Sequence, residues 1–99
     1  MAEHTKVPVV IRDKYVMYLE FYENLIWFHT DVKKWNSNIK KQFLEDLNLL
    51  QYLINVPLMA YIEDSNTKLA KFAQLIHFQK VTNVMLENGE KATIFIRSK

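Results

Sequence analysis

The sequence predicts one α/β domain over residues 1–99, of the α+β kind, with a mixed sheet in the order strand, strand, strand, helix, strand, helix, strand, strand. Three observations lead to this prediction. Aromatic and β-branched runs fill residues 7–32, apolar residues recur at helical spacing after Ile39, and an Asn88-Gly89 pair separates the last two apolar runs. With 49% hydrophobic residues, the chain has enough apolar material for a single core.

The first three elements are predicted strands. The runs at residues 7–11, 15–22 and 25–29 are rich in valine, isoleucine and aromatic residues. The polar breaks at residues 12–14 and 23–24 are short enough for antiparallel hairpins. We therefore expect three consecutive strands that pair in chain order.

An amphipathic helix and a buried strand are predicted next. Apolar residues follow a spacing of three and four at Ile39, Phe43, Leu47, Leu50 and Ile54. Ser37 or Asn38 is expected to cap the helix start, and Pro57 to end the helix. The apolar run at residues 58–62 suits a buried strand. Residues 25–62 have the length of a strand, helix and strand, so we expect a parallel, right-handed crossover.

A second helix and a hairpin complete the predicted order. Asp64, Ser65 and Asn66 are the possible caps of this helix. Its apolar face contains Leu69, Phe72, Ala73 and Ile76. The runs at residues 81–86 and 92–96 are the hairpin strands. The Asn88-Gly89 pair between them predicts a type I′ turn, which needs positive φ at both central residues.

Composition narrows the classes of function. The chain has no cysteine, which excludes disulfides, thiolate metal sites and cysteine nucleophiles. Its formal charge is only +2, with acidic residues among the basic ones, which argues against nucleic-acid binding. The first six residues lack an apolar signal region, and no apolar run is long enough to span a membrane. We expect a soluble protein without membrane contact.

Four stretches together resemble a known fold. They are Leu25 to Val32 with the following Trp35, Asn66 to Phe72, Leu75 to Phe78, and the Asn88-Gly89 hairpin. In this order the chain resembles the C-terminal half of the Gcn5-related N-acetyltransferase (GNAT) fold, and most closely the short acetyltransferase-like proteins of bacteriophages. The resemblance covers residues 25–97. It implies a GNAT-like domain truncated at its N-terminal side, without one wall of the acceptor site, located in the host cytoplasm or the virion.

The resemblance also implies where acetyl-CoA would bind. The family holds the pyrophosphate with a loop of the form Gln/Arg-x-x-Gly-x-Gly/Ala at a helix N-terminus, whereas residues 33–41 of this chain contain no glycine. The candidates for holding the cofactor are Asn38, Lys40 and Lys41, with solvated surface lysines as the alternative. Asn66 matches the asparagine that contacts the cofactor in the family, although a capping role explains it equally.

The catalytic positions of the family are also altered. The tyrosine that protonates the leaving thiolate is replaced by Ala73, and the glycine that ends the helix by His77, for which left-handed geometry is costly. Glu20 is a candidate base flanked by aromatic residues, or a simply solvated carboxylate. His29 and Asp31 lie on one strand face and could pair or bind a metal. Their spacing matches no known ligand pattern, so no metal site is predicted.

These observations favour binding over catalysis. The aromatic residues of the first strands could form a stacking platform for single-stranded nucleic acid, but acidic residues interrupt them, and packing explains them better. Without its N-terminal wall, the sheet would expose an apolar face that a protein partner or a second copy covers. We expect a non-catalytic, acetyltransferase-like phage protein that acts through protein contacts, in the virion or against a host factor. The alternative is a reduced acetyl-CoA-dependent N-acetyltransferase with Glu20 as base.

Overall fold

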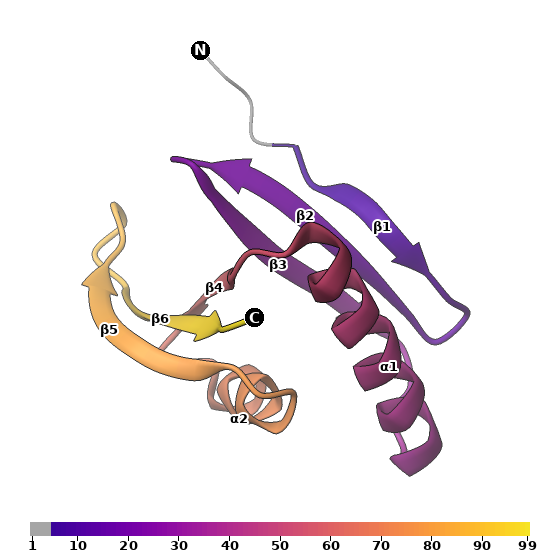
Figure 1. The fold of residues 1–99 in the computed structure, drawn as a ribbon. Helices are drawn as coiled ribbons and strands as arrows, with labels where there is room; N and C mark the ends of the chain where they lie inside the picture. Colours follow the sequence, from indigo (N-terminus) through magenta and orange to yellow (C-terminus); the bar gives the residue numbers. More distant parts are fainter. Residues whose placement is uncertain (1–4) are drawn as a thin grey trace.

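The computed structural model describes residues 5–99, which form six strands and two helices. The elements are β1 (Val7–Ile11), β2 (Tyr15–Tyr22), β3 (Leu25–Val32), α1 (Ser37–Ile54), β4 (Leu58–Glu63), α2 (Thr67–Leu75), β5 (Gln79–Met85) and β6 (Lys91–Arg97). All six strands belong to one sheet in the order β1-β2-β3-β4-β6-β5 (Figure 1). The predicted fold class and element order are confirmed.

The first three strands form the expected antiparallel meander. Tyr22 pairs with Leu25, so Glu23 and Asn24 form a two-residue loop between β2 and β3. Both loop residues have positive φ, 51° and 64°, as a type I′ turn requires. A two-residue loop fixes the register of the two strands, and with it the cross-strand neighbours on each face of the sheet.

The type I′ turn predicted in the last hairpin is wrong. Of its two central residues only Gly89 has positive φ, 85°. The Gly89 N–H donates to the carbonyl oxygen of Leu86 at 2.9 Å, and the Leu86 N–H donates to that of Glu90 at 2.7 Å. This pattern is a type I turn followed by a left-handed glycine, the form typical of three-residue hairpin loops.

Helix α1 connects β3 to β4, which run parallel as predicted. The predicted cap at Ser37 or Asn38 is wrong, because the cap is Asn36, whose side chain accepts from the Ile39 N–H at 2.9 Å. At the other end Asn55 takes left-handed geometry, with φ 56°, and ends the helix. The strand β4 then begins directly after Pro57.

Helix α2 ends in a Schellman motif. The Phe78 N–H donates to the carbonyl oxygen of Ala73 at 2.9 Å, and the His77 N–H donates to that of Gln74 at 3.1 Å. His77 has φ 73°, so it adopts the left-handed geometry that the sequence led us not to expect. The fold imposes this geometry despite a local cost of about 1–2 kcal/mol for a residue with a side chain.

Both helices pack on the same face of the sheet. The ring of Phe43 on α1 lies 4.8 Å from Tyr15 on β2 and 5.6 Å from Phe72 on α2, measured between centroids. These side chains belong to one core cluster that also includes the buried residues Met17, Leu19, Phe28, Leu47, Leu58, Ile62, Ala73, Ile76, Phe78 and Phe95. The molecule therefore has two layers, one of helices and one of sheet.

The other face of the sheet, the open face, has no helix from residues 5–99 on it (Figure 1). Side chains of alternate residues on β2, β3, β4 and β6 point to this face. They include Tyr18, Trp27, Met59, Tyr61, Ile94 and Ile96. None of the helices in the described part of the chain is long and apolar enough to cross a membrane.

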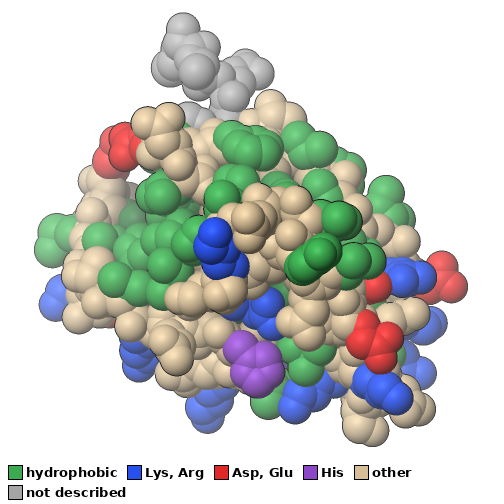
Figure 2. All heavy atoms as spheres, viewed as in Figure 1, with side chains coloured by type: hydrophobic (Ala, Val, Ile, Leu, Met, Phe, Trp, Pro, Cys, Tyr) green, Lys and Arg blue, Asp and Glu red, His purple; other side chains and the backbone are tan. Residues whose placement is uncertain are grey.

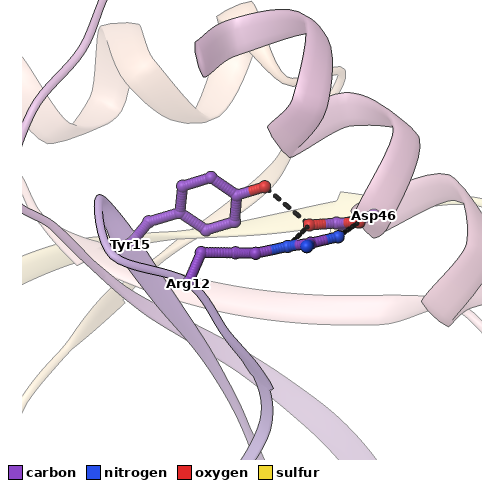
Figure 3. A network of polar contacts seen from close by, with 3 residues as sticks. All are labelled: Arg12, Tyr15 and Asp46. Carbon is purple, nitrogen blue, oxygen red and sulfur yellow. Dashed lines mark hydrogen bonds and ion pairs between the residues drawn. The ribbon is translucent and has the colours of Figure 1, made fainter.

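A polar network joins α1 to the β1–β2 hairpin (Figure 3). The guanidinium of Arg12 donates two hydrogen bonds of 2.9 Å to the carboxylate of Asp46, and the Tyr15 hydroxyl donates a third of 2.6 Å. The hydrogen bonds from Arg12 lower the pKa of Asp46 below its ordinary value of 3.8. Burial, together with the Asp46 carboxylate, raises the pKa of Tyr15, so its hydroxyl stays a donor.

A second network surrounds Arg97, which is only 7% exposed. Its guanidinium donates to the carbonyl oxygen of Ile76 at 2.9 Å, to Oε1 of Gln51 at 2.6 Å and to Oδ1 of Asn48 at 2.7 Å. Gln51 in turn donates to the carbonyl oxygen of Arg97 at 2.6 Å. One side chain thus holds β6, the C-terminal half of α1 and the end of α2 together.

Candidate functional site

The candidate site lies where β3 and β4 separate. The two strands pair only at Ile26 with Leu58 and at Trp27 with Met59, near their starts. Beyond these positions β3 continues to pair with β2, and β4 with β6. Figure 1 shows the resulting division, with β1, β2 and β3 in one half of the molecule and β4, β6 and β5 in the other. Ligands of open α/β sheets bind at such carboxyl ends of parallel strands.

The separated strands leave a cavity of about 380 Å³ between them. We call this cavity the splayed cleft. Its lining from the core side is apolar and includes Phe28, Ala60, Ile62, Leu69, Phe72, Ala73, Ile76 and Phe78. Polar side chains at its mouth are Lys6, Tyr18, His29, Thr30, Asp31 and Tyr61. The cleft therefore combines an apolar interior with a polar rim, as small-molecule sites commonly do.

Ala73 lies at a decisive position in this cleft. It is buried on α2 and lines the cavity, and its correspondence to the tyrosine acid of the resembled family stays a prediction. A methyl group can neither donate nor accept a proton. Proton transfer to a leaving group from this position is therefore impossible in this chain.

A second hollow of about 480 Å³ adjoins the cleft at the starts of α1 and α2. Its lining contains Lys33, Lys34 and Lys68 and no acidic side chain. The partial positive charge at two helix N-termini adds to that of the lysines. An anion would be attracted here, although the loop at residues 33–36 has no glycine that would let a phosphate approach its backbone closely.

Asn66 lies at the same hollow and caps α2. Its side-chain oxygen accepts from the Leu69 N–H at 3.1 Å, which is the capping role that the sequence offered as the simpler explanation. Asn38, Lys40 and Lys41 are on the first turn of α1, and none of them lines either hollow. The lysines that line the second hollow come from the loop before α1 and the start of α2.

Glu20 and His29 form a close pair on the open face. Oε1 of Glu20 lies 2.6 Å from Nε2 of His29, and both side chains are largely buried. Glu20 is therefore not simply solvated, and His29, rather than Glu20, lines the splayed cleft. The sequence did not predict this pair. The two-residue loop at Glu23 and Asn24 contained the signal, because its register puts Glu20 diagonally across from His29.

Tyr18 and Asp31 form a second hydrogen-bonded pair between β2 and β3, next to Glu20 and His29. The Tyr18 hydroxyl donates to Oδ2 of Asp31 at 3.1 Å, which raises the pKa of Tyr18. His29 and Asp31 therefore each have a partner on β2 instead of sharing a ligand. Among residues 5–99 no group of three or more histidine, aspartate or glutamate side chains could hold a metal ion.

Comparisons with known proteins give a fold but no family. No known family matches the sequence, and no curated protein does. A solved structure assigned to the GnaT family of acetyltransferases, from Bordetella pertussis, has a TM-score of 0.68 and 13% identity over 86% of this chain and 57% of its own. A structure assigned as an acetyltransferase, from Sphaerobacter thermophilus, has a TM-score of 0.47 and 10% identity over 87% and 61%.

The chain thus has the fold of GNAT-family acetyltransferases. It spans less than two thirds of the length of the Bordetella pertussis structure. At this identity the likeness establishes the architecture, and the side chains of the cleft have to carry any argument about function.

Proposed function

We propose that this chain is a non-catalytic, acetyltransferase-like protein that acts by binding another protein, either within a phage virion or on a host factor. The observation that carries the proposal is the open face of the sheet, which no helix of residues 5–99 covers. In this proposal the chain corresponds to the C-terminal half of the fold, and a partner covers the open face of the sheet.

The chemistry of the open face suits a protein partner. Its apolar side chains come from four strands, and the rings of Trp27 and Tyr61 contact each other at 6.1 Å between centroids. Two of its charged groups already have partners on the face itself, Glu20 with His29 and Asp31 with Tyr18. A surface with aromatic residues and few free charges is typical of the centre of a protein interface.

The poor fit of this chain to acetyl-CoA also supports a non-catalytic role. Acetyl-CoA would need a close backbone approach at residues 33–36, where there is no glycine, and a proton donor where the chain has Ala73. The residues present do not fit the group. The lysines of the adjoining hollow remain able to attract an anion by charge alone.

Affinity capture with matched variants tests the binding function. Tyr61 is exposed at the centre of the open face, and Leu75 is exposed on α2, on the helix side. We expect a protein retained by the wild type to be lost with Tyr61→Glu, which puts a charge into the contact, and kept with Leu75→Glu. The same pattern should hold with the purified partner. Equal retention by both variants would exclude the open face as the binding surface.

A reduced N-acetyltransferase is the second candidate, and one observation favours it. His29 lines the cleft with Glu20 behind it, and a carboxylate that orients a histidine is the usual support of a general base. In this case His29 would take the amine proton and Glu20 would hold the ring.

A thiol-release assay with a panel of amines tests this candidate. We expect no release above the uncatalysed rate. Release that falls at least tenfold with His29→Gln, but not with the surface variant Lys14→Gln, would overturn the non-catalytic proposal in favour of the second candidate. Lys14 is suitable as the control because it is exposed and lines neither hollow.

A further inference from the structure

The open face carries acidic side chains but no lysine or arginine on its central strands. Glu20 on β2 and Asp31 on β3 point to this face by the same alternation that places Tyr18 there. In the described chain, no lysine or arginine occupies an open-face position on β2, β3, β4 or β6. The whole chain has 13 lysine and arginine residues against 11 acidic ones, so most of its basic groups lie elsewhere. The open face therefore differs in charge from the rest of the molecule.

A hollow at the β2–β3 turn combines apolar walls with one carboxylate. This cavity of about 710 Å³, which we call the hairpin hollow, is lined from the open face by Tyr22, Leu25, Met59 and Ile96. The only charged side chain in its lining is that of Glu23, which lies in the two-residue turn. Figure 2 shows hydrophobic side chains gathered on the side of the β2–β3 hairpin, with acidic atoms at their upper edge and basic atoms mainly along the bottom of the molecule.

The negative charge at the hairpin hollow is not neutralised within the chain. Among residues 5–99, neither Glu23 nor Asp31 takes part in an ion pair. Lys6 lines the splayed cleft and not the hairpin hollow. The Glu23 carboxylate, with smaller effects of burial and of Glu87, raises the pKa of Tyr22. Glu87 in the β5–β6 loop thus adds to the negative charge at the same side chain, and a cation is the complementary ligand.

We propose that the open face binds a basic segment of its protein partner, and that a lysine or arginine side chain of this segment enters the hairpin hollow and pairs with Glu23. Lysine and arginine have an apolar stem and a cationic head, so the stem can lie against Leu25 and Met59 while the head reaches the carboxylate. The exposed ring of Tyr22 offers a cation–π contact to the same head. This inference rests on the proposed function, because it names the kind of segment that the open face binds.

Fluorescence anisotropy with short labelled peptides tests the charge of the occupant. Three peptides share their leucine positions and have lysine, glutamine or glutamate at all the others. We expect the lysine peptide to bind, and the other two to bind about tenfold more weakly or not at all, because they leave the carboxylates of the open face without a partner. Added salt should weaken binding of the lysine peptide, because exposed ion pairs are screened. Equal binding of the three peptides, or no binding of the lysine peptide, would overturn the inference.

Matched charge reversals locate the contact. Glu23→Lys should lower the affinity for the lysine peptide about tenfold or more, because it puts a like charge in the hairpin hollow. Glu45→Lys makes the same change of net charge on α1, and it should leave the affinity unchanged. Glu45 is exposed and lines neither the hairpin hollow nor the splayed cleft. Circular dichroism checks that both variants remain folded. An equal loss with both variants would mean attraction by net charge alone and would contradict the inference.

Cross-linking of the wild type gives a second readout that no folding defect can imitate. A carbodiimide, which joins a carboxylate and a contacting amine through an amide bond, should couple the lysine peptide to Glu23 and not to Glu45, as mapped by mass spectrometry. Coupling to both residues alike would rule out a specific contact at the hairpin hollow. A captured partner that Tyr61→Glu loses and Glu23→Lys keeps would refute this inference and leave the proposed function standing. A partner that neither variant loses would refute both.

Discussion

Replacing Arg97 by methionine tests how β6 and both helices are held together. The guanidinium donates to Gln51 and to the carbonyl oxygen of Ile76 in the interior, and to Asn48 at the surface. Methionine fills a similar volume but leaves the two interior oxygens without a donor. Each unsatisfied buried acceptor costs about 1–3 kcal/mol. Methionine also removes the cost of burying the guanidinium charge, which offsets part of this loss. We therefore expect the free energy of unfolding to fall by about 2–4 kcal/mol.

The measurement is urea unfolding followed by the fluorescence of the two tryptophans, with thermal unfolding as a check. A loss of that size corresponds to a fall of roughly 10–25 °C in Tm for a domain of this length. The variant Asn48→Ala is the control. It removes only the partner at the surface, so it should cost much less than Arg97→Met. A loss below about 1 kcal/mol for Arg97→Met, or an equal loss for Asn48→Ala, would refute this reasoning.

The remaining predictions concern single side chains, each measured by the same unfolding assay. His77→Gly should stabilise the fold by about 1 kcal/mol, because glycine takes the left-handed geometry at φ 73° without a steric cost; a loss of stability would contradict that account. Asn36→Ala should cost about 1 kcal/mol and Ser37→Ala much less, because Asn36 is the cap. Asp46, whose pKa is lowered in the folded chain, stabilises the fold above its ordinary pKa of 3.8, and this contribution disappears as the pH falls through the folded pKa. From pH 7 down into the acid range, the stability of Asp46→Asn should therefore depend less on pH than that of the wild type. An identical pH profile would rule out a stabilising role of the Asp46 carboxylate.

The order of the elements could be predicted because it depends on local periodicity. Helical spacing from Ile39 and alternating apolar runs before it are visible without any knowledge of tertiary contacts. Turn types were harder. The Asn88-Gly89 pair predicted a type I′ turn, yet the loop length selected a type I turn with a left-handed Gly89, while Glu23 and Asn24 formed the type I′ turn. Loop length depends on where strand pairing stops, and that is a long-range property.

The candidate site was only partly predictable for the same reason. The sequence predicted Ala73 at the position of the family's tyrosine acid because the motif around it is contiguous, and this correspondence stays a prediction. The pairing of Glu20 with His29 depends on a register that the β2–β3 loop sets, so it could have been inferred but was not. The separation of β3 from β4 depends on where their pairing stops, which is a long-range property that no local pattern encodes.

Isothermal titration calorimetry with acetyl-CoA tests the central claim most directly, namely that the fold is retained without its cofactor chemistry. The loop at the second hollow has no glycine, and the splayed cleft has Ala73 where a proton donor would be needed. We therefore predict no saturable heat of binding up to about 1 mM acetyl-CoA, an affinity limit of about −4 kcal/mol. A dissociation constant in the micromolar range or below, lost with charge reversal of Lys33, Lys34 and Lys68, would contradict the claim.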